Sequence, residues 1–202
     1  MAVSQKPEFT LITRMTHMLI AVAVVVQLAT SLFMNAHPQD GSEDVLFEIH
    51  EYSGLISFGI IVAFWVIVLF RRRGTSLSEL FPWFSARRRK ELIEAVKARF
   101  GRADGASPLS FYADDPLAKA VHGLGIAIIS VMAVTGLTYF VALKLDVSEG
   151  ITALAAMSVH EPMSKLAWGY LITHAGIAVL HAFRKERPLS IMWNIYPSSQ
   201  KK

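Results

Sequence analysis

The sequence predicts an all-α integral membrane protein, built as a bundle of four membrane-spanning helices. Of the 202 residues, 53% are apolar and only 18% are charged, so the chain is far more apolar than a typical soluble domain. Four apolar runs are long enough to cross a bilayer as helices. Most of the seven histidines fall inside these runs, whereas the charged residues collect between them.

All four predicted spans belong to one domain, residues 1–202. We expect the first span to stay in the membrane, because it is too long for the apolar region of a signal peptide and no small-residue cleavage site ends it. The third span is expected to start at Pro116, since proline suits the first turn of a helix. The spans lie at about residues 12–34, 46–70, 117–143 and 159–183.

The connection between the second and third spans contains a predicted surface helix. Within Ser85–Phe100, apolar residues recur at helical spacing among arginines and lysines, with Leu92, Ile93 and Val96 as examples. This pattern is typical of an amphipathic helix that lies on the membrane surface. It could dock a partner protein, or it could hold the bundle to lipid through snorkelling basic side chains, which we favour.

Charge predicts how the chain is oriented. The long loop at 71–115 and the carboxyl-terminal tail are rich in Lys and Arg, whereas the two other connections are mainly acidic. By the positive-inside rule, both termini and the long loop face the cytoplasm. Orientation and anionic lipid explain these basic residues, so no nucleic-acid partner is expected.

Histidine is the residue type that points to chemistry. His160, His174 and His181 are 14 and 7 residues apart, so they lie on nearly the same side of one helix. At a rise of about 1.5 Å per residue, the first two are about 21 Å apart along an axis that crosses about 30 Å of hydrocarbon. His50 and His160 fall near the periplasmic side. The cytoplasmic side receives His17, His122, His174 and His181.

Imidazoles at two depths indicate two noncovalently bound haems of the b type. A haem iron takes two axial imidazoles from opposite sides, so the ligands of each haem should come from different helices. The chain contains no cysteine, which excludes thioether-attached haem and cysteine-ligated iron–sulfur clusters. Depth allows His50 to pair with His160, but it leaves open which of the four inner histidines form the second pair.

Three basic residues in or near the spans could contact a haem, and two other classes of function compete with the haem hypothesis. Lys165 lies inside the last span and is a candidate to pair with a haem propionate, and so are Arg14 and Arg184 near the span ends. His37 is expected to be a solvated loop residue. A histidine-based metal-ion transporter is an alternative, although such sites usually add carboxylates at membrane depth. A purely structural anchor would need no row of histidines.

Short motifs surround the histidines on every span. They are Arg14-Met-Thr-His17, Glu48-Ile-His50-Glu-Tyr-Ser-Gly54, His122 with Thr135-Gly136-Leu137, His160-Glu161, Ile172-Thr-His174-Ala and Leu180-His181. With these motifs the chain resembles the bacterial four-helix di-haem cytochromes b, which include prokaryotic cytochrome b561 and the membrane subunits of formate dehydrogenases and nickel-iron hydrogenases. The chain departs from the family in Met18, where the family often has Trp, and in its longer basic loop.

The resemblance implies a location in the inner (plasma) membrane of a bacterium and a set of roles for the histidines. His17 with His174 would hold the cytoplasmic-side haem, and His50 with His160 would hold the periplasmic-side haem. His181 is similar to a family histidine near a quinone site, and His122 to one that does not bind iron. An interfacial His181 bonded to lipid or backbone is the alternative to this quinone role.

The implied function is a transmembrane electron carrier that is a quinone-linked oxidoreductase or a subunit of one. It would exchange electrons between the quinone pool, its substrate, and a periplasmic-side donor or acceptor. The alternative is a membrane anchor subunit of a larger respiratory dehydrogenase or hydrogenase. Expected partners are membrane lipid, quinone and a periplasmic or membrane redox protein, and the interpretation leaves room for a homodimer.

Overall fold

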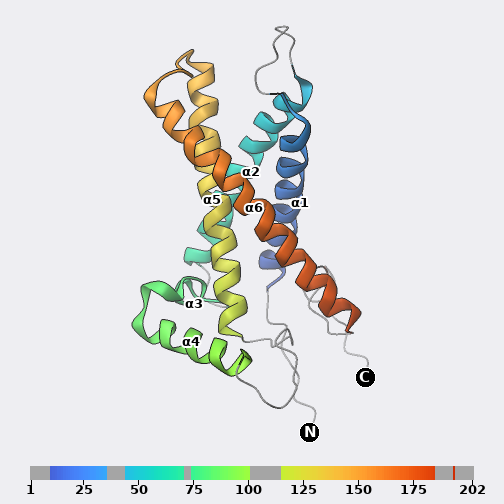
Figure 1. The fold of residues 1–202 in the computed structure, drawn as a ribbon, viewed down its shortest axis with the longest axis vertical. Helices are drawn as coiled ribbons and strands as arrows, with labels where there is room; N and C mark the ends of the chain where they lie inside the picture. Colours follow the sequence, from blue (N-terminus) through green and yellow to red (C-terminus); the bar gives the residue numbers. More distant parts are fainter. Residues whose placement is uncertain (1–9, 36–43, 71–73, 101–114, 185–192, 194–202) are drawn as a thin grey trace. The chain divides into compact units, whose positions relative to one another are not determined.

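The structure is a computed structural model that describes residues 10–35, 44–70, 74–100, 115–184 and 193. His37 lies outside the described residues. Among them there is no strand, and each of the four long helices is long and apolar enough to cross a membrane. The prediction of an all-α protein with four membrane-spanning helices is therefore confirmed. These helices are α1 (Leu11–Phe33), α2 (Val45–Phe70), α5 (Pro116–Lys144) and α6 (Ile151–Phe183) (Figure 1).

The predicted surface helix is present and is preceded by two short helical segments. The segments are α3 (Leu77–Leu80) and the 3-10 helix η1 (Pro82–Phe84), and the surface helix itself is α4 (Ala86–Phe100). Ser85 precedes α4 because it caps the helix: its carbonyl accepts the Arg89 N–H at 2.9 Å. We call residues 77–100 the strap.

Helix α6 begins at Ile151, well before the start near residue 159 that hydropathy predicted. Residues 151–158 are mostly apolar and include three alanines, which favour a helix, but residues 159–183 are already long enough to cross a bilayer, so span length alone places the start too late. Its first turn is closed by the Leu154 N–H, which donates to the Gly150 carbonyl at 3.0 Å. His160 therefore lies inside a continuous helix rather than at its start.

Aspartates cap the beginnings of α2 and α5. The carboxylate of Asp44 accepts the Asn35 N–H and, at 2.8 Å, the Leu46 N–H. The first of these bonds is the largest cause that holds the pKa of Asp44 below its usual range. Asp115 accepts the Leu117 N–H at 3.0 Å in the same manner. Both spans are thus given a defined starting residue.

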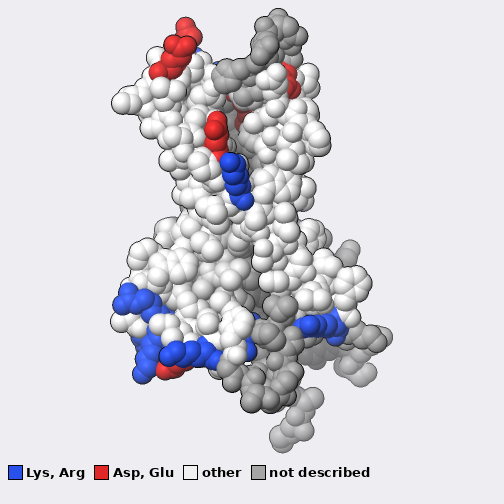
Figure 2. Space-filling model, in the orientation of Figure 1, with Lys and Arg blue, Asp and Glu red and all other residues white. Residues whose placement is uncertain are grey.

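The chain divides into two compact units, and each long helix contributes one part to each. Unit 1 comprises residues 1–15, 67–126 and 171–202, and unit 2 comprises residues 16–66 and 127–170. Unit 1 contains the strap. Figure 2 shows lysines and arginines gathered over α4 in this unit.

Within unit 1 the strap is fastened to the first turns of α5. Lys119 Nζ lies 2.8 Å from the Glu79 carboxylate, and Arg99 of α4 pairs with Asp115. A Cβ at Gly123 would lie only 1.8 Å from the backbone carbonyl oxygen of Leu80. Only glycine allows the two backbones to approach this closely. Figure 1 shows α4 crossing the end of α5 rather than running along it.

The Glu79 carboxylate is ionised at neutral pH. Burial alone would raise the pKa of Glu79, but hydrogen bonds from Lys119 and Ser76 outweigh it and lower that pKa to about 2. Arg88 of α4 adds a longer contact at 4.0 Å. Glu79 therefore joins Lys119 of α5 to Arg88 of α4.

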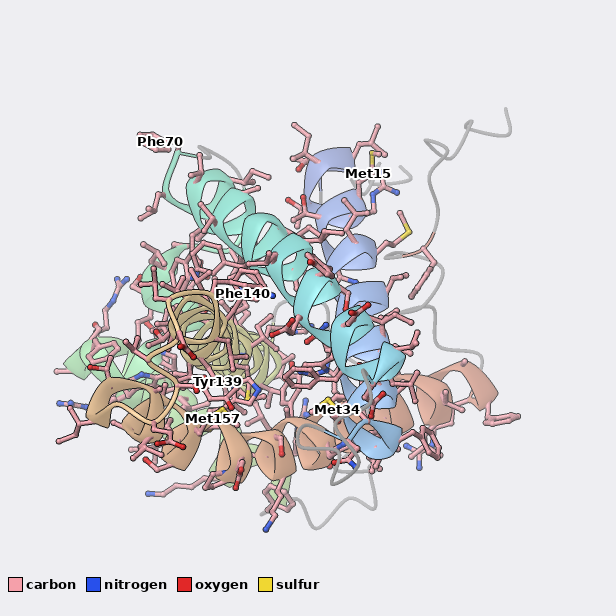
Figure 3. All side chains as sticks on the ribbon, turned by 90° about the horizontal axis from the view of Figure 1, so that it is seen from above. Met15, Met34, Phe70, Tyr139, Phe140 and Met157 are labelled. Atoms are coloured by element: carbon pink, nitrogen blue, oxygen red, sulfur yellow. The ribbon has the colours of Figure 1, made fainter. Side chains whose placement is uncertain are left out.

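In unit 2, α2 and α5 pack side by side. The Trp65 indole N–H donates to the Ser130 hydroxyl at 2.9 Å. Phe140, labelled in Figure 3 on the side of α5 toward α2, meets the Tyr52 ring edge to face with 6.4 Å between ring centres. Lys144 Nζ lies 3.7 Å from the carboxylate of Glu51, the residue that follows His50.

Candidate functional site

Two predicted ligands face each other in unit 2. His50 on α2 and His160 on α6 have ring centres 6.5 Å apart and ring planes at 84°. Metal–imidazole bonds of about 2 Å place the centres of two axial rings about 6 Å apart across one iron. The planes of both rings would contain the nitrogen–iron–nitrogen axis, and each ring can rotate about that axis. Perpendicular ring planes are therefore compatible with such a pair. The observed spacing fits two imidazoles on opposite sides of one haem iron.

A threonine from a neighbouring helix holds one nitrogen of each ring. Thr30 Oγ1 on α1 lies 2.9 Å from His50 Nδ1, and Thr135 Oγ1 on α5 lies 2.9 Å from His160 Nδ1. Each hydroxyl already donates to the carbonyl one turn earlier in its own helix, at 2.9 and 2.8 Å. Each threonine therefore accepts a hydrogen bond from Nδ1–H, which leaves the Nε2 lone pair of each histidine available for iron.

The backbone around this pair is shaped to admit the rings. A Cβ at Gly136 would lie 3.2 Å from His160 Cε1, so glycine leaves the space that the imidazole needs. On the other side, Gln27 of α1 donates through Nε2 to the His50 carbonyl at 3.0 Å. Sequence reasoning missed Gln27 and Thr30. In the sequence each of them is only a polar side chain inside an apolar run. The packing of α1 on α2 is what shows which groups they contact.

A second imidazole contact lies in unit 1. The rings of His122 on α5 and His174 on α6 have centres 5.1 Å apart and planes at 83°. His122 Nδ1 lies 2.7 Å from the Ala118 carbonyl, to which it donates. A separation of 5.1 Å is shorter than the roughly 6 Å required across an iron. His17 belongs to unit 2, so its predicted pairing with His174 stays a prediction.

The remaining candidate residues differ in exposure. Arg14 and His181 are buried, each with 8% of its surface exposed, whereas Lys165 and Arg184 are exposed. Arg14, His181 and Arg184 belong to unit 1 with His122, and Lys165 belongs to unit 2. No group of three or more His, Asp or Glu side chains that could hold a metal ion occurs in the part of the chain that the structure describes.

Four membrane-spanning helices with two imidazoles at this spacing fit a membrane cytochrome of the b type. A family model described as prokaryotic cytochrome b561 matches residues 8–194, and the chain belongs to that family. It is accordingly a multi-pass bacterial membrane protein and a transmembrane electron carrier that uses b-type haem. No curated protein and no solved structure matches the chain.

Proposed function

We propose that this cytochrome carries electrons through two b-type haems, between the quinone pool and a donor or acceptor on the periplasmic side. The observation that carries the proposal is the His50–His160 pair, with ring centres 6.5 Å apart and both Nδ1 atoms occupied by threonines. A bound b-type haem supplies reversible one-electron chemistry. Two histidine ligands on its iron would leave no position open for oxygen.

The residues of the chain set where each haem is held. His50 and His160 would hold one haem in unit 2, and Thr30 with Thr135 would fix the orientation of both rings. For the second haem, the family resemblance supports His17 and His174 as ligands. Lys165 remains a candidate for a propionate. The basic strap supports a cytoplasmic location for its end of the bundle, in the inner membrane, by the positive-inside rule.

We propose that the quinone site includes His181. It lies one heptad beyond His174 on α6, about 10 Å along the helix axis, so it is too far away to bind the same iron. Its 8% exposure supports a position in the protein interior rather than toward lipid. Arg14, Arg184 and His122 belong to the same unit and are candidates to contact the quinone with it. An imidazole there can give a proton to a quinone oxygen or take one from it.

Replacing His181 by alanine should leave both haem spectra almost unchanged and slow quinone-dependent haem reduction or oxidation about 10- to 100-fold. This scale is roughly that of losing a positioned proton donor or acceptor. Stopped-flow spectroscopy of the purified cytochrome with a reduced quinone analogue measures the rate. Val179→Ala, at an exposed position on the same helix, is the matched control. Wild-type kinetics in His181→Ala would refute the quinone role, and loss of a haem would show that His181 is a ligand.

A further inference from the structure

We propose that His122 is a positioning residue for His174: its Nε2 accepts a hydrogen bond from His174 Nδ1–H and thereby orients the ligand imidazole. This inference rests on the proposed function in one respect, the role of His174 as an iron ligand. It gives His122 a definite role beside the cytoplasmic-side haem. It also makes α5 the helix that supports both ligands of α6.

The first support is the hydrogen-bonding state of His122. Its Nδ1 donates to the Ala118 carbonyl at 2.7 Å, so Nδ1 carries the hydrogen. A neutral imidazole with a hydrogen on Nδ1 has an acceptor lone pair on Nε2. Nitrogen–nitrogen hydrogen bonds of about 2.9 Å between two imidazoles correspond to ring centres about 5 Å apart. The rings of His122 and His174 are 5.1 Å apart, which fits this bond and is too short for an iron between them.

The second support is the parallel arrangement in unit 2. There Thr135 of α5 accepts the Nδ1–H of His160, and the Thr135 hydroxyl donates to the carbonyl of Val131, four residues earlier. His122 likewise donates to the carbonyl four residues before it. In both places α5 presents a side chain whose own hydrogen is already used, so that only its acceptor remains for a histidine of α6.

The third support is the way α5 is held around His122. Lys119, one turn earlier, is paired with Glu79 at 2.8 Å. Gly123, the next residue, packs directly against the Leu80 carbonyl. The strap therefore holds the backbone on both sides of His122. A fixed backbone suits a residue whose task is to orient another side chain.

When the nitrogen that does not bind the metal donates a hydrogen bond to an acceptor, the imidazole becomes a stronger electron donor to its metal. A stronger donor stabilises ferric over ferrous iron and so lowers the midpoint potential. Removing the acceptor should therefore raise the potential of the haem that His174 ligates. The other haem, whose ligands are supported by the two threonines, should keep its potential.

The test is a redox titration of the purified di-haem protein, followed by optical and EPR spectroscopy. In His122→Ala we expect both haems to remain bound, the potential of one haem to rise and its low-spin ferric EPR signal to shift. His122→Gln, whose amide oxygen can accept a hydrogen bond, should move both readouts back toward wild type. Thr135→Val is the matched control and should shift the other haem alone.

Three results would overturn the inference. Loss of a haem in His122→Ala would make His122 an iron ligand. Unchanged potentials in His122→Ala would show that its ring does not act on a ligand, whether or not quinone kinetics change. A shift of the same haem in His122→Ala and Thr135→Val would contradict the separate assignment. Failure of the proposed function is distinguishable, because His174→Ala would then retain both haems.

Discussion

Replacing His50 or His160 by alanine should remove mainly one haem, and replacing His17 or His174 should remove mainly the other. In the proposed pairing each pair shares one iron, so loss of either imidazole would leave that iron with one axial ligand and no covalent attachment. The haem-to-protein ratio should fall to about half of the wild-type value in each single variant. Pyridine haemochrome assays give the ratio, and redox difference spectra identify which haem remains.

The controls separate ligation from support. Thr30→Val removes only the acceptor on His50 Nδ1 and should keep both haems. His37→Ala tests a histidine outside the proposed ligand set and should also keep both. The pairing is wrong if His50→Ala and His174→Ala lose the same haem. It is also wrong if His50→Ala and His160→Ala lose different ones.

Replacing Gly123 by alanine should displace the strap from α5. The new Cβ would lie 1.8 Å from the Leu80 carbonyl oxygen, which is backbone and cannot rotate away. Overpacking of this kind typically costs about 1–3 kcal/mol, and a clash with backbone falls at the upper end. We expect a lower Tm and faster tryptic cleavage at the basic residues of α4. Because His122 is the adjacent residue, one haem spectrum should change as well.

Gly169→Ala is the matched control for this substitution. Gly169 is also inside a membrane-spanning helix, but a Cβ there would meet nothing within 4 Å. Alanine favours a helix over glycine by about 1 kcal/mol, so this variant should be as stable as wild type or slightly more stable. Equal Tm values and equal cleavage rates for Gly123→Ala and Gly169→Ala would contradict the close packing of the strap on α5.

The four spans could be predicted because bilayer thickness sets the length of an apolar helix. The start of α6 could not, because residues 159–183 are already long enough to cross the bilayer, and span length gives no reason to extend the helix back through the mostly apolar residues 151–158. Capping likewise placed the start of α4 one residue after Ser85. Boundaries of this kind depend on local hydrogen bonds that hydropathy does not register.

The candidate site, like the helices, could be predicted from the sequence only in part. Heptad spacing placed His160 and His174 at two depths, and depth alone allowed His160 to pair with His50. The supporting threonines were not predicted, since a threonine in a helix commonly bonds its own backbone and nothing in the sequence shows that it also meets a ring. Thr30 and Thr135 acquire that second contact only through the packing of one helix against the next.

The haem content of the purified protein is the most direct test of the proposed electron carrier. We expect about two b-type haems per chain, released by acidified acetone and low-spin in both oxidation states, because the proposal gives each iron two histidine ligands. A preparation with every histidine intact that holds a single haem, no haem, or zinc in its place would contradict the proposal.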